Sequence, residues 1–312
     1  MKRNIIDVIR RGFDNSVANW PLLLFRFAET IVALFLIIGS IIAVIVPMIV
    51  SAGMSHFNPE DASSAAEAVL SFIVQHLAII GWVVALLTGV SFVIVAVHSF
   101  VMAGAARVLV DADRAAGDAP ASRDRYRLFT ADRFFDGGKR GWWPVFWIYN
   151  IAYFVAFLIV SLPILLFLAI AILVAPSTPA LIAVGCFGAA ITVVVMLATG
   201  IVTAVWSQKA IVVQSSRALG GMDSLRHAWR DMRVDFVRHF GVAIVMMVIG
   251  FAISSALTTV SLMFSPPMPH QVGAVVGMMF LPARMAATSI SSVLGSALAI
   301  WWTASFAAME DE

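Results

Sequence analysis

The sequence predicts an all-α polytopic membrane protein: six transmembrane helices, as three tandem repeats of a basic amphipathic interfacial helix followed by a transmembrane hairpin. Two observations predict this class. Apolar residues make up 61% of the 312 residues and charged residues only 12%, whereas a soluble domain averages about 25% charged residues. Nearly all of the positive charge also lies in every second connection between the apolar runs, which is typical of a chain that crosses a membrane repeatedly.

Six apolar runs define the predicted spans. A helix rises 1.5 Å per residue, so about 20 residues cross the hydrocarbon core of a bilayer. The runs are continuous and show no alternation of apolar and polar residues, which favours helices over the strands of a barrel. The runs are Leu22–Val50, Phe72–Ala106, Val145–Val174, Leu181–Ser207, Val242–Phe264 and the shorter Met285–Trp302.

One unit recurs three times along a single membrane domain, residues 1–312. The segments where each second run leaves the membrane are similar: RVLVDADRAAGD from Arg107, AIVVQSSRALGG from Ala210 and AIWWTASFAAME from Ala299. A period of roughly a hundred residues is too long for a solenoid and indicates duplication of a supersecondary unit. The predicted repeats are residues 1–106, 107–209 and 210–312.

The positive charge predicts the orientation. Nineteen of the 20 lysines and arginines lie before or just inside the first run, or in the connections after the second and fourth runs; only Arg284 lies elsewhere. The positive-inside rule places this basic face in the cytoplasm, so both termini are expected there. The first run is too long for the core of a signal peptide and should remain as an anchor. We therefore expect a multi-pass protein of the bacterial inner membrane.

The connection after the fourth run has the pattern of an amphipathic helix. Between Met222 and Phe240, apolar residues recur every three or four positions, and Asp223 is placed to cap the helix start. Arginines occupy the other faces. A helix of this kind lies in the plane of the lipid headgroups; the alternative is that it packs on neighbouring cytoplasmic helices.

Two fainter copies of this pattern are predicted. One runs from Arg123 to Phe135 with Ser122 as its cap, and the other lies at the N-terminus with Asn4 as its cap. Together the three stretches offer arginines to anionic lipid headgroups. The candidate lipid contacts are Arg10, Arg11, Arg123, Arg127, Arg226, Arg230 and Arg233.

Tryptophans mark the predicted cytoplasmic boundary, since indole favours the membrane interface. Pro21 and Pro144 directly follow tryptophans and are each expected to start a transmembrane helix. On the opposite side, residues 58–61 (Asn-Pro-Glu-Asp) read as a helix start, and Gln271–Leu281 reads as a re-entrant or interfacial piece too short to span. The predicted interface anchors are Trp20, Trp142, Trp143, Trp147, Trp206, Trp229, Trp301 and Trp302.

Ionisable residues within the runs are the candidates for a polar site, because burying them in a membrane is costly. Glu29 and His98 each lie about eight residues from the cytoplasmic end of their runs, on adjacent helices, so contact between them is possible. Neither has a counterpart in the other repeats. The alternative is that Arg26, one turn before Glu29, neutralises the carboxylate. Arg284 completes the candidate set.

Other chemistry is sparse. The sequence has no phosphate-binding glycine loop, no histidine pair at metal spacing and no nucleophile elbow, and its single cysteine, Cys186, excludes an internal disulfide. We therefore expect no cofactor, no metal site, no nucleic-acid partner and no enzymatic activity.

The repeated unit consists of a basic helix, a tryptophan and an apolar hairpin, with segments such as SSRALGGMDSLRHAW from Ser215. This unit resembles the membrane domain of bacterial glycerophosphodiester phosphodiesterases and of related standalone bacterial six-helix proteins of unknown function. The resemblance covers most of the chain through hydropathy and a loose residue pattern. It implies the same six-helix architecture. The catalytic domain of that family has no counterpart in this chain, so no catalytic residue is carried over. Mitochondrial carriers are excluded, because the charged signature that ends their odd-numbered helices is missing.

Two function classes remain open. The favoured one is a non-enzymatic module that organises lipids, preferably anionic, or a membrane partner through its interfacial helices, with a homo-oligomer as one possible assembly. The alternative is a transporter or channel for a small or lipidic solute, with Glu29 and His98 in its pathway.

Overall fold

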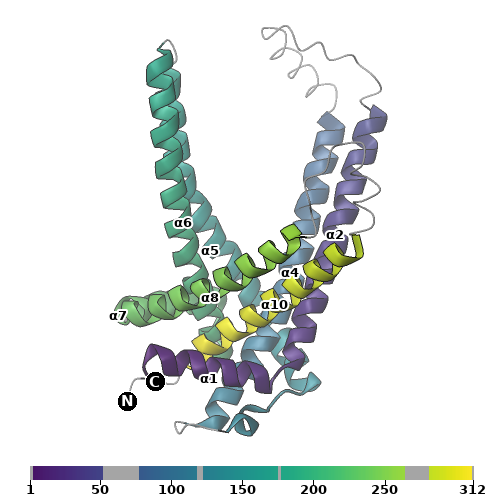
Figure 1. The fold of residues 1–312 in the computed structure, drawn as a ribbon, viewed down its shortest axis with the longest axis vertical. Coiled ribbons are helices and arrows are strands. Elements are labelled where there is room, and N and C mark those ends of the chain that lie inside the picture. Colours follow the sequence, from purple (N-terminus) through teal and green to yellow (C-terminus); the bar gives the residue numbers. More distant parts are fainter. Residues whose placement is uncertain (1–2, 52–76, 118–121, 175–176, 264–280, 311–312) are drawn as a thin grey trace. The chain divides into compact units, whose positions relative to one another are not determined.

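The computed structural model describes residues 3–51, 77–117, 122–174, 177–263 and 281–310, and the described residues are helical apart from short turns. Figure 1 shows these helices in chain order. The helices are α1 (Ile5–Ala18), α2 (Pro21–Ser51), α4 (Leu77–Ala116), the 3₁₀ turn η1 (Arg123–Tyr126), α5 (Ala131–Val174), α6 (Thr178–Arg217), α7 (Gly221–Val234), α8 (Phe236–Met263) and α10 (Leu281–Ala307).

Six of these helices, α2, α4, α5, α6, α8 and α10, are long and apolar enough to cross a membrane. The apolar lengths of five of them are little buried within the chain, and only α10 is more than a third buried. The outward-facing side chains of α5 include Phe157, Leu165 and Leu173. Side chains of this kind need an apolar solvent around them. The chain is therefore an integral, multi-pass membrane protein.

The chain divides into two compact units. The first unit comprises residues 1–27 together with 99–312, and the second comprises residues 28–98. The predicted repeat boundaries at residues 106 and 209 both fall inside continuous helices, α4 and α6. The three-repeat arrangement stays a prediction.

Within the first unit, α5 packs along α6, α1 along α10, and α8 along α10, while α7 contacts both α5 and α6. Figure 1 shows α5 and α6 as an antiparallel pair. The core of this unit gathers where the short helices meet the ends of the long ones, with Val8 of α1, Phe134 of α5, Met232 of α7 and Phe306 of α10 among its buried side chains. The close packing therefore lies at the ends rich in basic residues.

The predicted N-terminal helix with Asn4 as its cap is present as α1. Asn4 occupies the N-cap of α1, and its side-chain oxygen accepts a hydrogen bond from the backbone N–H of Asp7 at 2.8 Å. This bond satisfies one of the amide groups that a helix start leaves without a partner. Pro21 starts α2, as its fixed backbone angle predicts.

The amphipathic helix predicted from Arg123 to Phe135 is wrong. Residues from Arg123 form only one 3₁₀ turn, which ends at Tyr126, and Ser122 makes no side-chain capping bond. The extended residues that follow are held by Asn19, whose side-chain oxygen accepts hydrogen bonds from the backbone N–H groups of Leu128 and Phe129 at 3.1 and 2.8 Å. These tertiary bonds compete with the helical ladder and replace it.

Pro144 does not start the third span, because α5 begins thirteen residues earlier at Ala131. The preceding turns pack closely on the end of α4: a Cβ atom on Gly137 would stand 2.7 Å from Cβ of Arg107. A proline inside a helix costs about 3 kcal/mol through its missing N–H and its clash with the preceding turn. We attribute the uninterrupted helix to this packing, which the glycine makes possible.

The helix predicted over residues 222–240 is two helices. It breaks at Asp235, which leaves the helical region between the end of α7 and the start of α8, and the N-cap of α7 is Gly220 instead of Asp223. The apolar spacing runs through the break unchanged, so periodicity could not reveal it. The predicted helix start at residues 58–61 and the piece at 271–280 lie outside the described residues.

Candidate functional site

The predicted lipid-contact arginines lie on three segments: α1, η1 with the residue after it, and α7. Six of the seven have exposed side chains: Arg10, Arg123, Arg127, Arg226, Arg230 and Arg233. Arg226 forms an i,i+3 ion pair with Asp223 at 3.5 Å, and both side chains remain more than half exposed. An exposed ion pair of this kind contributes little to stability, so the guanidinium group stays accessible to a second anion.

Arg11 is the exception, and its assignment as a lipid contact is wrong. Its side chain is 10% exposed, and its Nη2 atom donates to Oδ1 of Asp113 at 3.0 Å and to the carbonyl oxygen of Gly117 at 2.9 Å. The guanidinium carbon also lies 5.6 Å from the centre of the Tyr126 ring. A second arginine, Arg3, reaches the other carboxylate oxygen of Asp113 at 3.3 Å. Arg11 therefore fastens α1 to the end of α4.

Two buried polar residues complete this attachment of α1. Asn15 donates its amide hydrogen to the carbonyl oxygen of Leu109 at 2.9 Å, and Asn19 donates to that of Tyr126 at 2.7 Å. Burial raises the pKa of the Tyr126 hydroxyl above its usual value, with the neighbouring Arg11 charge acting in the opposite direction. The fold thus holds Tyr126 in its neutral form.

The opposite edge of α1 is bound to α10. The indole of Trp301 donates its N–H to the carbonyl oxygen of Ile9 at 2.9 Å. The same indole meets the ring of Phe13 edge-on, with 5.1 Å between the ring centres. The two helices cross so closely at Gly12 that a Cβ atom there would overlap Ser305. Trp301 is therefore a structural donor to α1 as well as a predicted interface anchor.

A similar bond holds α7. Trp206 of α6 donates its indole N–H to the carbonyl oxygen of Leu225 at 2.8 Å, and Ser224, Leu225, Ala228 and Met232 form the buried face of α7. The outer face carries Met222 and Trp229, each more than 40% exposed, at helical spacing with Arg226 and Arg233. Met222 and Trp229 therefore share one exposed face of α7 with Arg226 and Arg233.

The other predicted tryptophan anchors differ in exposure. Trp20, Trp143, Trp147 and Trp229 are exposed, which suits a position in a lipid interface. Trp142 and Trp302 are half-buried. Trp143 stacks in parallel on Phe146 and meets Trp147 edge-on, so the WWPVFW segment is an aromatic cluster on one side of α5.

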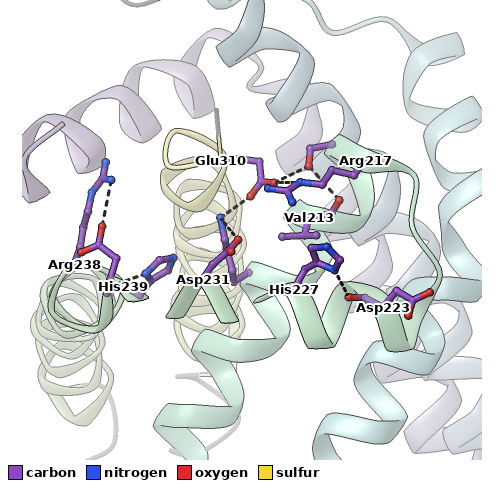
Figure 2. A network of polar contacts seen from close by, with 11 residues as sticks. Val213, Arg217, Asp223, His227, Asp231, Arg238, His239 and Glu310 are labelled. Carbon is purple, nitrogen blue, oxygen red and sulfur yellow. Dashed lines mark hydrogen bonds and ion pairs between the residues drawn. The ribbon is translucent and has the colours of Figure 1, made fainter. Parts of the chain in front are cut away.

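A buried ionic cluster, which the sequence did not predict, ties the C-terminal residues to α6 (Figure 2). Lys209 Nζ lies 2.5 Å from Oε2 of Glu310, and Arg217 Nε lies 3.0 Å from Oε1 of the same carboxylate. The hydroxyl of Ser216 donates to Oε1 at 3.0 Å. Charges this deeply buried need such complete pairing, because their desolvation otherwise exceeds the gain.

The two ionisable residues singled out within the apolar runs are in contact. His98 Nδ1 lies 2.7 Å from Oε1 of Glu29, and the two side chains are 25% and 9% exposed. Both belong to the second unit, on α4 and α2 respectively. The contact explains how a carboxylate is accommodated so far along an apolar helix. Arg26 lies three residues before Glu29 on α2, and Arg284 lies in α10 at a position where only the backbone is described.

The sequence did not predict the buried ion pairs of Asp113, Lys209 and Glu310, because each residue lies at the end of a span, where a charged side chain is expected to face water. A usable signal was present for Lys209, which directly follows the fourth apolar run and has no acidic residue within a helical turn on either side. An amine buried at that point requires an acidic partner from elsewhere in the chain. Nothing local points to Glu310 as that partner.

Comparison of the chain with protein-family models, with curated proteins and with solved structures finds no match. The fold defines the class: an integral membrane protein with six membrane-length helices in the part of the chain that the structure describes.

Proposed function

We propose that this chain is a non-enzymatic module of the bacterial inner membrane, whose basic segments bind anionic lipid headgroups and so organise lipid, or a membrane partner, around it. The resemblance to the membrane domain of glycerophosphodiester phosphodiesterases belongs to the same proposal. In this arrangement α1, η1 and α7 lie on the cytoplasmic side. Their arginines are the binding groups.

The outer face of α7 is the observation that carries the proposal. One side of α7 is fixed to α6 through Trp206 and the buried Leu225. The other side exposes Met222 and Trp229 among arginines. Exposed apolar side chains beside guanidinium groups fit the boundary between headgroups and acyl chains, where the aromatic or thioether group inserts and the charge meets phosphate.

Rigid attachment supports an organising role. An interfacial helix on a mobile tether would accept any lipid arrangement around it. In contrast, α1 is held by the buried Arg11–Asp113 ion pair and the Asn15 hydrogen bond, and α7 by the bond from Trp206 to Leu225. The spacing of the exposed arginines is therefore preset. A backbone that is already fixed adds little to the conformational entropy lost when a lipid binds, which favours selection among headgroups.

Titration of the purified protein with defined lipids, followed by native mass spectrometry, tests the proposal. Phosphatidylglycerol should bind more tightly than phosphatidylcholine at low salt. Replacing Arg226 and Arg233 together by glutamine should reduce the preference by about tenfold or more, at about 1 kcal/mol for each charge. The matched Arg226→Lys, Arg233→Lys variant keeps both charges and should retain most of the preference. Equal binding of both lipids to the native protein would refute the proposal.

The alternative function, transport of a small solute, is favoured by one observation. Glu29 and His98 form a titratable pair inside an apolar region of the second unit, and pairs of this kind serve proton relays in transporters.

A further inference from the structure

A cavity of about 300 Å³ opens beneath α1 in the first unit, beside the segment where α1 passes into α2. Residues of four helices line it: Phe13 and Val17 of α1, Leu23 of α2, Ile253 of α8, and Leu294 and Ala297 of α10, with Trp20 and Trp301 beside them. The volume lies within the range of ligand pockets in proteins. We call it the α1 cavity.

The chemistry of the lining selects an apolar occupant. Ser16 is the only lining residue that is neither aliphatic nor aromatic, and its hydroxyl already donates to the carbonyl oxygen of Phe13 at 2.8 Å. The Trp301 N–H is likewise engaged with Ile9. A polar solute would lose its hydration here without new hydrogen bonds in return, whereas an alkyl chain has no polar group that would be left without a partner.

The cavity reaches from α1 into the transmembrane region. Ile253 and Leu294 lie in the membrane-crossing parts of α8 and α10, and Leu294 is seven residues from Trp301, a distance of roughly 10 Å along a helix. An occupant can therefore have one end at the level of α1 and the other among the spans. A phospholipid acyl chain has this shape.

The charged residues near the end of the cavity at α1 indicate which kind of headgroup the lipid would carry. Arg10 precedes Phe13 and Val17 on the same helical stripe and has an exposed side chain. Arg123 of η1 stands over the Phe13 ring, 5.9 Å from its centre, and its Nε atom lies 2.8 Å from Oδ1 of Asp14. These two arginines and one aspartate carry a net positive charge at the point where a headgroup would emerge.

We infer that the α1 cavity holds one acyl chain of an anionic phospholipid whose phosphate is bound by Arg10 and Arg123. This inference rests on the proposed function and gives it a specific site: one lipid bound within the protein, in addition to the lipids around α7. The occupant is a lipid of the surrounding leaflet, and phosphatidylglycerol is the probe.

Filling the cavity tests the inference. Ala297→Phe places a ring in the α1 cavity, and Ser291→Phe places the same ring at an exposed position of α10 outside the lining. Native mass spectrometry with phosphatidylglycerol should show one tightly held lipid on the native protein and on Ser291→Phe, and its loss on Ala297→Phe. Retention of that lipid by Ala297→Phe, with circular dichroism and elution volume unchanged, overturns the inference.

The headgroup is tested separately. Arg10→Gln should weaken the tightly held phosphatidylglycerol about five-fold, while Arg140→Gln, a change at an arginine of α5 whose side chain is 81% exposed, should not. Equal retention of phosphatidylcholine and phosphatidylglycerol in the cavity would overturn the anionic assignment. The α7 variants report on different residues, so failure of the cavity site and failure of the proposed function give different results.

A second measurement does not depend on a cavity-filling variant. Phosphatidylglycerol with brominated acyl chains, added at one equivalent, should quench tryptophan fluorescence, because bromine quenches only at short range and Trp20 lines the cavity. Trp20→Phe should remove part of this quenching. Identical quenching in the native protein and in Trp20→Phe would place the chain elsewhere and overturn the inference.

Discussion

Lys209 and Glu310, one hundred and one residues apart, form a buried ion pair in which neither side chain is more than 3% exposed. The same carboxylate binds Arg217, so the residues after α10 are fastened to the end of α6 at two points. This cluster fixes the C-terminal residues against the packed end of the first unit, where α7 is also held.

Removing one partner of this pair should destabilise the protein strongly. Lys209→Met leaves the Glu310 carboxylate buried with only Arg217 and Ser216, and breaking a buried pair in this way costs about 3–5 kcal/mol. The double variant Lys209→Met, Glu310→Gln should recover part of the loss, because the two charges that lose a partner, those of Arg217 and Asp231, lie on side chains that are 44% and 32% exposed. Thermal unfolding in detergent measures both effects. An unchanged melting temperature for Lys209→Met would show that the pair is not buried as described.

Replacing Arg11 should lower the stability of the protein, whereas replacing the adjacent Arg10 should not. Arg11→Gln removes the bond to Asp113 and leaves a buried carboxylate with Arg3 alone, so its melting temperature should fall. Arg10→Gln changes an exposed side chain and, in detergent without added phospholipid, should leave the melting temperature within about the effect of an ordinary surface substitution, roughly 0.5 kcal/mol. A comparison of the two variants by thermal unfolding tests the docking of α1. Equal effects on stability would contradict it.

Alkaline pH should weaken the contact between α1 and η1. Burial raises the pKa of Tyr126 above the usual value of about 10 for a tyrosine, so folding favours the neutral hydroxyl. This contribution is fully present below pH 10 and is lost as the pH rises through the higher pKa of the folded state. Between pH 9 and pH 11.5 the native protein should lose more stability than Tyr126→Phe, as measured by unfolding temperature. Parallel pH profiles would show that Tyr126 makes no such contribution.

The Glu29–His98 pair separates the two functions. If the protein organises lipids, Glu29→Gln should leave lipid selection intact and lower stability only modestly, since a neutral amide can still bond to His98. If it transports, the same change should abolish a proton- or cation-coupled flux. Proteoliposomes with a pH-sensitive internal dye and an imposed potential measure the proton case. We expect native, Glu29→Gln and protein-free vesicles to acidify at the same rate; a conductance that Glu29→Gln removes would favour transport.

The sequence predicted features that depend on local composition. Six membrane-length helices follow from apolar length alone, and Asn4 was predicted as the cap of α1 because its side chain can reach a backbone amide two or three residues on. The contact between Glu29 and His98 was a possibility raised by counting residues from the ends of their runs, and the structure shows it.

Features that depend on tertiary partners were not predictable. Arg10 and Arg11 are identical in type and adjacent, and only the position of Asp113 on α4 decides that one is exposed and the other buried. Pro144 looked like a helix start because the packing of Gly137 on Arg107 has no local signature. The break at Asp235 was hidden because the apolar spacing continues across it.

Lipid binding by α1, η1 and α7 requires that the chain cross the membrane six times with these three elements together in the cytoplasm. Cysteine labelling tests it in a Cys186→Ala background, since Cys186 is exposed on α6. Ser177 and Ser122 are exposed probes for the two sides, and Met222 is preferable to the buried Ser224 as the probe of α7.

A membrane-impermeant maleimide applied to intact cells should label Ser177→Cys and leave Ser122→Cys and Met222→Cys unlabelled until the membrane is permeabilised. Labelling of Met222→Cys from outside, with Ser177→Cys protected, would reverse the orientation and contradict a cytoplasmic lipid-binding role for α7.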